Sequence, residues 1–298
     1  MCDKGNRNAS TISRRFNKKG QKRCSFDLKD LTLRHKDNLI LNLSIMKYKS
    51  REESGIGDIR RAVVVGASSG IGLEVVKQLL EVGVKTGVAA RRHDRLKMLK
   101  DEHPDLIETS CIDVTSPDSA NLLSGLINRL GGMDLFVYAS GYGKENTQLE
   151  PSIELQTVET NCMGFTRMLG EAFRFFRSQG HGHIAAITSV IVVKGVGSAP
   201  SYSATKAMQS AYLQALEQQI SSQKLDIHIS DIRPGFVDTD FIKGGRTYPM
   251  QLSPNLVAHR LLRAVRKNRH VCIIDWRYKV LTSLWRMVPN WVWRRMHF

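Results

Sequence analysis

The chain has 298 residues, 42% of them hydrophobic and 24% charged, which is ordinary for a globular protein that can bury a core. Its formal net charge of +16 is unevenly divided: residues 1–60 carry 15 Lys/Arg and 7 Asp/Glu, residues 259–298 carry 10 and 1, and residues 61–258 carry 19 and 20. Because the central part is neutral, we do not expect a nucleic-acid partner.

The cysteines predict a reducing compartment, and the hydropathy pattern predicts neither a membrane-spanning segment nor a secretory signal. The five cysteines are far apart and form no C-x-x-C pair, so neither a disulfide framework nor a zinc site is expected. His181 and His183 precede a predicted strand and lack further ligands, and we predict no metal site. There is no 18-residue apolar run to span a bilayer and no uninterrupted apolar stretch of a secretory signal. The expected location is the cytoplasm.

Residues 1–57 hold scattered basic and polar residues, with one short apolar patch at 39–46 and no sustained period. We interpret them as a disordered extension or as a start-site artefact, since Met46 precedes a more conventional lead-in.

From Arg61 onwards, short apolar segments alternate with amphipathic ones. The predicted strands are 61–67, 85–90, 106–112, 133–139, 183–189, 225–232 and 270–275. The predicted helices are 71–83, 93–103, 116–130, 153–179 and the segment that contains Tyr202. Repeated β-α alternation predicts an α/β fold, a single doubly wound Rossmann domain with a parallel sheet and helices on both faces. We assign this domain to residues 58–274.

A glycine-rich turn, VVVGASSGIGLEVV, follows the first predicted strand and opens the first predicted helix. Glycines there let the backbone approach a pyrophosphate, whose charge meets free N–H groups and the helix dipole. Glycines alone also suit an ordinary turn, but the strand, cluster, helix and next strand together favour a dinucleotide. The predicted cofactor-binding residues of this turn are Gly66, Ser68, Ser69, Gly70, Ile71 and Gly72.

The second predicted strand ends in Ala90 and Arg91, where an NAD-preferring protein has an acidic residue for the ribose hydroxyl. An arginine accommodates a 2′-phosphate instead, so we predict NADP(H), with Arg91 and Arg92 as phosphate partners; alternatively, both arginines solvate a loop. Asp113 and Val114 are predicted to hold the adenine, although Asp113 equally suits capping of the next helix.

A serine, a tyrosine and a lysine follow at fixed spacing. Tyr202 comes thirteen residues after Ser189, Lys206 comes four residues after Tyr202, and Asn161 lies on the preceding long helix. With the glycine turn, this pattern resembles the short-chain dehydrogenase/reductase family, in its shorter single-domain branch, over about residues 60–240. The resemblance implies that these four residues form a catalytic tetrad, and that Tyr202 and Lys206 also contact the cofactor.

Two further segments can be compared with motifs of that family; one resembles its motif and the other departs from it. RPGFVDTDF resembles its P-G motif, with Thr239 placed to meet the nicotinamide end. YASG, residues 138–141, departs from the family's usual N-N-A-G, which puts local rigidity beside the cofactor in doubt, although Gly141 and Gly143 still allow close backbone approach. The cofactor-binding residues implied by these segments are Gly141, Pro234, Gly235, Val237 and Thr239.

The chemistry of carbonyl reduction explains these residue types. Hydride transfer leaves an alkoxide to be protonated, for which a phenol is a suitable acid, and its phenolate is the base in the reverse direction. Tyrosine titrates near pKa 10, so basic function asks for a fall of about 2–3 units, which Lys206 and the oxidised nicotinamide favour. Ser189 would bind the substrate oxygen, and the resemblance implies that Asn161 holds a water connecting Lys206 to solvent.

The predicted function is an NADP(H)-dependent oxidoreductase acting on the carbonyl or secondary alcohol of a small molecule. The predicted pocket rim is mainly apolar, which favours a lipophilic substrate; it comprises Tyr142, residues 190–193, Phe236, Phe241 and the loop to Leu252. The alternative is a non-catalytic NADP(H)-binding protein at a membrane surface. A sugar-nucleotide epimerase is disfavoured by the glycine spacing. We also expect a homo-oligomer.

The C-terminal tail, residues 275–298, contains all four tryptophans, interleaved with five basic residues. A basic, aromatic segment suits a membrane interface. It equally suits a lid on the substrate mouth or a dimer contact. Pro289 would break any helix through it.

Overall fold

The computed structural model describes residues 58–239, 248 and 250–296. The predictions for residues 1–57 and for Phe241 lie outside these ranges.

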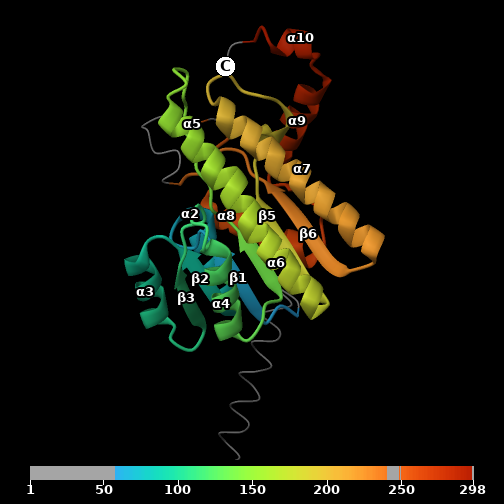
Figure 1. Cartoon of the computed structure of the whole chain (residues 1–298). Coiled ribbons are helices and arrows are strands. Elements are labelled where there is room, and N and C mark those ends of the chain that lie inside the picture. Colours follow the sequence, from blue (N-terminus) through green and yellow to red (C-terminus); the bar gives the residue numbers. More distant parts are fainter. Residues whose placement is uncertain (1–57, 240–247, 249, 297–298) are drawn as a thin grey trace, which may run out of the picture. The chain divides into compact units, whose positions relative to one another are not determined.

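A parallel sheet forms the centre of the described domain (Figure 1). In the described residues it has seven strands in the order β3-β2-β1-β4-β5-β6-β7. The strands are β1 (Arg61–Val65), β2 (Lys85–Ala90), β3 (Ile107–Cys111), β4 (Leu135–Tyr138), β5 (His181–Ile187), β6 (Asp226–Arg233) and β7 (Val271–Ile273). Because β1 pairs with β2 on one side and β4 on the other, the topology reverses there, which is where such sheets bind ligands.

Helices connect the strands. They are α2 (Gly70–Glu81), α3 (His93–Glu102), α4 (Ser119–Leu130), α5 (Pro151–Val158), α6 (Phe165–Gln179), α7 (Pro200–Gln223), α8 (Pro254–Arg266), α9 (Trp276–Met287) and α10 (Asn290–Trp293). A π-helix, η1 (Glu159–Gly164), joins α5 to α6, and a 3₁₀ helix, η2 (Val190–Val193), follows β5. Local signals fit these bounds: Ser253 caps α8 by accepting from the Leu256 N–H, and Pro289 separates α9 from α10.

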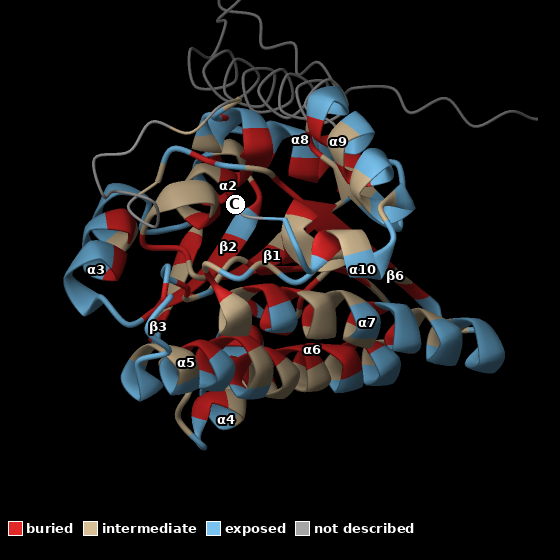
Figure 2. Cartoon of the chain, turned by 90° about the horizontal axis from the view of Figure 1, so that it is seen from above, coloured by how far each residue is buried: buried red, intermediate tan, exposed pale blue. Residues whose placement is uncertain are grey.

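The two faces of the sheet bury separate cores. Ala62 and Val64 of β1 pack under α2, α3 and α8, whereas Val63 and Val65 pack under α4, α6 and α7. Figure 2 shows these two helical layers with their buried residues turned toward the sheet. Side chains along a strand alternate between faces, so a strand covered on both sides is apolar throughout. The doubly wound α/β prediction is therefore confirmed.

The structure differs from the sequence-based assignment in several elements. The predicted helix 153–179 is interrupted by the π-helix η1, and α8, α9 and α10 were not among the predicted helices. His181 and His183 lie within β5 rather than before it; the His183 ring is buried and hydrogen-bonds the Ser230 hydroxyl at 2.9 Å. Within the described ranges, no group of three or more His, Cys, Asp or Glu residues is arranged to hold a metal ion.

Candidate active site

The glycine-rich turn brings three backbone segments together at the switch point. Gly66 has φ +89°, and a Cβ on it would lie 2.7 Å from the backbone of Ala139 and Ser140. A Cβ on Gly72 would lie 2.2 Å from the Gly66 carbonyl oxygen. Glycine is therefore required at both positions for steric reasons. Since α2 begins at Gly70, its positive end lies at this turn and suits a pyrophosphate.

Arginines lie beside that turn. Arg92 donates from Nε and Nη2 to the Ser68 hydroxyl at 3.1 and 2.9 Å, and from Nη2 to the Ser69 hydroxyl at 2.5 Å. Arg95, which the sequence reasoning missed, donates to the Ser68 carbonyl oxygen at 3.2 Å. Arg91 is exposed and lines the same cavity. Arg91, Arg92 and Arg95 therefore all lie at the glycine-rich turn.

Asp113 shapes the turn after β3. One carboxylate oxygen accepts from the Thr115 backbone N–H at 3.0 Å and from the Thr115 hydroxyl at 2.8 Å. Burial acts to raise the pKa of Asp113, but these hydrogen bonds and the charge of Arg91 together lower the pKa. The N-cap of α4 is Asp118, so the alternative that Asp113 caps this helix is wrong. Asp113 and Val114 line the cavity, where the adenine was predicted.

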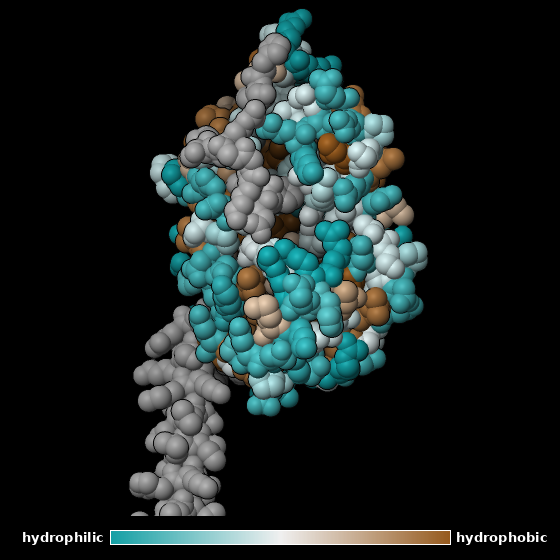
Figure 3. Space-filling view, turned by 90° about the vertical axis from the view of Figure 1, so that its left-hand side faces the viewer, coloured by the Kyte–Doolittle hydropathy of each residue, from teal (hydrophilic) through white to brown (hydrophobic). Residues whose placement is uncertain are grey.

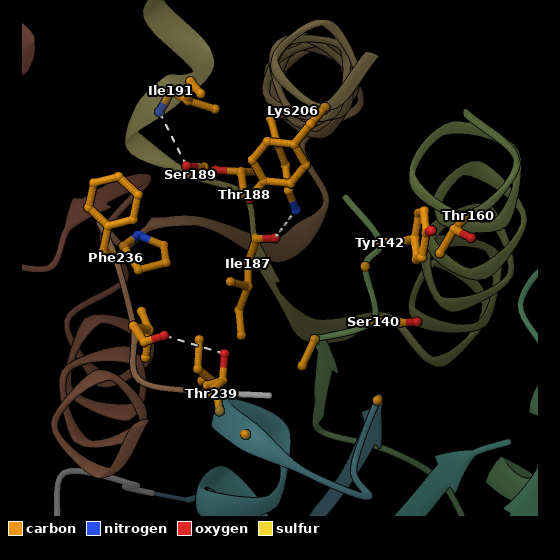
Figure 4. Close-up of a pocket in the computed structure, with 18 of the residues that line it drawn as sticks. Ser140, Tyr142, Thr160, Ile187, Thr188, Ser189, Ile191, Lys206, Phe236 and Thr239 are labelled. Atoms are coloured by element: carbon orange, nitrogen blue, oxygen red, sulfur yellow. Dashed lines mark hydrogen bonds between the residues drawn. The ribbon is translucent and has the colours of Figure 1, made fainter. Parts of the chain in front are cut away.

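The serine, tyrosine and lysine converge from β5 and α7. Ser189 follows β5, and its hydroxyl oxygen accepts from the Ile191 N–H at 3.2 Å (Figure 4). Tyr202 hydrogen-bonds Ser189, and the Lys206 Nζ lies 5.8 Å from the centroid of the Tyr202 ring. A Cβ on Gly143 would lie 2.3 Å from that ring, so the loop after β4 contacts it directly. All three side chains line one cavity.

The ammonium group of Lys206 is held by two acceptors. Nζ donates to the Ile187 carbonyl oxygen at 3.0 Å, as Figure 4 shows, and to Gln209 Oε1 at 3.0 Å. Gln209 is fully buried, and its Nε2 donates to the Asn161 carbonyl oxygen at 2.8 Å. Gln209 therefore bridges the lysine and the π-helix. The sequence reasoning missed it.

Asn161 lies in the π-helix and is fully buried. Its Oδ1 accepts from the Tyr142 N–H at 2.9 Å, and its Nδ2 donates to the Tyr142 carbonyl oxygen at 2.7 Å and to the Thr205 hydroxyl at 3.0 Å. The Tyr138 hydroxyl donates to the Thr160 carbonyl oxygen at 3.4 Å. These bonds fasten the segment after β4, where the family's usual asparagines are missing. The predicted water relay through Asn161 stays a prediction.

Burial has the largest effect on the pKa values of Tyr202 and Lys206. It raises the pKa of Tyr202 to about 12, although the Ser189 hydrogen bond acts in the opposite direction. It lowers the pKa of Lys206 to about 8, against the effect of the Asp231 carboxylate. The protein's own groups thus do not produce the predicted fall in the pKa of Tyr202, because desolvation disfavours the phenolate. Near neutrality the phenol keeps its proton and can donate it.

The cavity has a volume of about 1280 Å³ and extends from the glycine turn to an apolar end. Hydrophobic atoms lie at the bottom of a hollow in the space-filling view of Figure 3. Of the predicted rim, Tyr142, Val190, Ile191 and Phe236 line the cavity, whereas Val192 and Val193 do not. They face a smaller cavity beside α7, because η2 turns them away. The predicted cofactor residues that line the main cavity are Gly66, Ser68, Ser69, Gly70, Ile71, Arg91, Arg92, Asp113, Val114, Gly141, Tyr202, Lys206, Pro234, Gly235, Val237 and Thr239.

The C-terminal segment forms one wall of this cavity. Tyr278, Leu281 and Trp285 of α9 and Trp293 of α10 line it. Trp293 Nε1 donates to the Gly195 carbonyl oxygen at 2.7 Å, and the Trp285 and Trp293 rings meet edge-on at 5.5 Å. The segment therefore packs against the apolar end of the cavity, and its predicted role as a lid on the substrate mouth stays a prediction.

Comparison with known proteins identifies the family. A family model described as short chain dehydrogenase matches residues 60–247. The chain belongs to the short-chain dehydrogenase family. An uncharacterized oxidoreductase of Staphylococcus haemolyticus is 32% identical over 220 residues, which cover 71% of this chain and 93% of that relative. An uncharacterized oxidoreductase of Staphylococcus saprophyticus is 29% identical over 221 residues, covering 70% and 92%. Membership makes the protein an NAD(P)-dependent oxidoreductase.

Solved structures of a dehydrogenase and a ketoreductase share this fold. A 7β-hydroxysteroid dehydrogenase superposes with a TM-score of 0.68 at 16% identity, over 80% of this chain and 95% of that one. The actinorhodin polyketide ketoreductase with NADPH superposes with a TM-score of 0.63 at 24% identity, over 72% and 95%. At sequence identities this low, the similarity shows a shared fold and nothing about the substrate.

Proposed function

We propose that this short-chain dehydrogenase uses NADP(H) to interconvert the carbonyl and secondary alcohol of a lipophilic small molecule. The observation that carries the proposal is the placement of Ser189, Tyr202 and Lys206 in one cavity, between a glycine turn with arginines and an apolar end. No acidic residue ends β2, and Arg92 contacts both serine hydroxyls of the turn. This supports NADP(H) over NAD(H).

The chain's residues fit the cofactor. The glycine turn places the start of α2 on the cavity, where free N–H groups suit a pyrophosphate, and Arg91, Arg92, Ser68 and Ser69 would hold the 2′-phosphate. When bound, NADP(H) supplies or accepts the hydride. Two solved neighbours, a serine dehydrogenase complexed with NADP⁺ and ElxO with NADP bound, lend support as relatives in fold.

Each catalytic group has a distinct task in carbonyl reduction. The Ser189 hydroxyl binds the substrate oxygen and stabilises the charge that develops on it. Tyr202 donates its phenolic proton to that oxygen, and the raised pKa keeps this proton in place near neutrality. Lys206, held by the Ile187 carbonyl oxygen and Gln209, places a positive charge beside the ring. In the reverse direction Tyr202 takes the proton back.

The apolar end of the cavity supports a lipophilic substrate. Phe236 and Tyr248 stack with ring centroids 4.3 Å apart, and Leu281, Trp285 and Trp293 complete that end. Apolar pockets of this kind bind ligands mainly by removing apolar surface from water. A bulky ketone fits such a site better than a polyol.

The test is NADPH oxidation over a panel of steroid, retinoid, acyl and aromatic ketones. Tyr202→Phe should lower kcat by about 10²–10⁴-fold, the usual contribution of a general acid, with NADPH affinity changed only a few-fold. Tyr212→Phe, on the same helix but packed against Phe165, is the matched control and should retain activity. Bound NADPH without turnover of any ketone would favour the non-catalytic alternative. Turnover of polar polyols alone would contradict the lipophilic substrate.

A further inference from the structure

Helix α9 has two apolar faces. Its inner face carries Tyr278 and Thr282, which are buried, with Leu281 and Trp285 on the cavity. Its outer face carries large apolar side chains that are largely exposed: Trp276 at 73%, Val280 at 51%, Leu284 at 55% and Met287 at 77%. At 3.6 residues per turn these four lie within about 80° of one another around the helix axis. Packing against the domain therefore explains only the inner face.

A further large apolar side chain is exposed beyond Pro289. Trp291 of α10 is 64% exposed, and the Arg295 guanidinium lies 5.8 Å from the centroid of its ring. We call Trp276, Val280, Leu284, Met287 and Trp291 the outer stripe. Trp276, Leu284 and Trp291 are side chains that a globular surface rarely exposes together.

Basic residues flank the outer stripe. Arg277 follows Trp276 on one side of the helix, and Lys279 and Arg286 lie on the other, about 65–115° from the centre of the stripe. Arg294 and Arg295 are exposed at the far end. The one acidic residue of 275–296 is Asp275, whose carboxylate is already paired with Arg277 at 2.9 Å. The rim is therefore cationic.

The positive charge of this rim favours an anionic bilayer over a second copy of the chain as the partner. A second copy docked through the same face by two-fold symmetry would bring its own basic rim against this one, and the like charges would repel. An anionic bilayer has the opposite charge, and tryptophan and arginine or lysine are suited to its interface. None of the helices in the described part of the chain is long and apolar enough to cross a bilayer.

We propose that the outer stripe and its basic rim dock on the surface of an anionic phospholipid bilayer. The stripe enters the acyl boundary and the arginines and Lys279 contact lipid phosphates. Because the opposite face of the same helix is a wall of the cavity, the bilayer then lies one helix diameter from the substrate end. The docking does not depend on the proposed catalytic activity.

The primary experiment is flotation of the full chain with vesicles of phosphatidylcholine and phosphatidylglycerol, and with phosphatidylcholine alone. We expect binding to the anionic vesicles and at least about tenfold weaker binding of Leu284→Ser/Met287→Ser, since burial of even one such side chain contributes about this factor. Met98→Ser/Leu155→Ser changes two equally exposed side chains on α3 and α5, and should bind as the unchanged protein does. NADPH oxidation without vesicles should be equal in all three proteins.

Tryptophan emission gives a second readout, because all four tryptophans lie in this segment. Trp276 and Trp291 belong to the outer stripe, whereas Trp285 and Trp293 line the cavity. Anionic vesicles should shift the emission to the blue, and lipids with brominated chains should quench it. Trp276→Phe/Trp291→Phe should remove both responses while keeping the inner pair.

Three results would overturn the proposal. The first is no binding to anionic vesicles. The second is equal binding of Leu284→Ser/Met287→Ser, which would assign binding to the basic residues before Arg61. The third is a dimer that the same double variant dissociates, which would assign the outer stripe to contact between two copies.

Discussion

Tyr278 fastens the C-terminal helix to the loop that would contact the nicotinamide. Its hydroxyl accepts from the Phe236 N–H at 3.1 Å and donates to the Met250 carbonyl oxygen at 3.2 Å. A Cβ on Gly235 would lie 2.0 Å from Cζ and 2.1 Å from Cε2 of its ring. The ring is 2% exposed and its hydroxyl is held by both hydrogen bonds, so Gly235→Ala must displace the ring and strain the contact of α9 with this loop.

The magnitude follows from the two side chains. Overpacking of this kind costs about 1–3 kcal/mol, and contact with several ring atoms places Gly235→Ala at the upper end. Tyr278→Ala removes the ring and should cost about 3–5 kcal/mol, as other buried aromatic truncations do. In the Tyr278→Ala background the new methyl group meets a cavity, so Gly235→Ala should then cost little. The two effects should therefore couple by about 1–3 kcal/mol, giving a total smaller than their sum.

The assay is urea unfolding of the four proteins of this cycle, with the midpoint read at constant slope. Gly197→Ala is the control, because nothing lies within 4 Å of a Cβ at that exposed position. Its free energy of unfolding should change by less than about 0.5 kcal/mol. If the two substitutions add within about 0.5 kcal/mol, the contact between α9 and the cofactor loop does not carry the energy assigned to it.

Three further predictions concern Gln209, Lys206 and Arg92, which lie around the cavity. Gln209→Leu removes the bridge between Lys206 and the Asn161 carbonyl and should lower kcat more than it raises the Kd for NADPH. Lys206 has its pKa near 8, so it is charged below that pH and neutral above; kcat/KM for reduction should fall as pH rises through about 8. Gln209→Leu removes an acceptor from the ammonium, so the fall in kcat/KM should occur at lower pH. If the fall occurs at the same pH as in the unchanged protein, Gln209 contributes packing only. Arg92→Ala should weaken NADPH binding about tenfold or more with little change for NADH, and equal losses for both cofactors would contradict a 2′-phosphate contact.

The sequence predicted those parts of the site whose residues lie close together along the chain. The glycine turn, and the spacing of Ser189, Tyr202 and Lys206, could be read directly because one strand end and one helix start carry them. Gln209 could not be found this way. Its role depends on the π-helix, whose shifted hydrogen bonds leave the Asn161 carbonyl oxygen to a side chain from another helix.

The C-terminal segment shows a second feature that could not be predicted from the sequence. Its composition favours lipid, protein packing and a lid equally, because a helix with two apolar faces has no single amphipathic pattern. Only the fold shows that Tyr278 and Trp285 point inward while Trp276 and Met287 remain exposed. The absent asparagines in residues 138–141 put local rigidity in doubt, and only the fold shows that Tyr138 and Asn161 tie this segment to the π-helix.

The bond between Tyr278 and Phe236 also bears on the order in which ligands bind. The loop at Pro234–Val237 and α9 both line the cavity, and the Tyr278 hydroxyl joins them. Any ligand that changes the position of α9 changes the loop as well, and linkage requires the reverse effect to have the same free energy. Tyr278→Phe should therefore make cofactor and substrate affinities more nearly independent of each other.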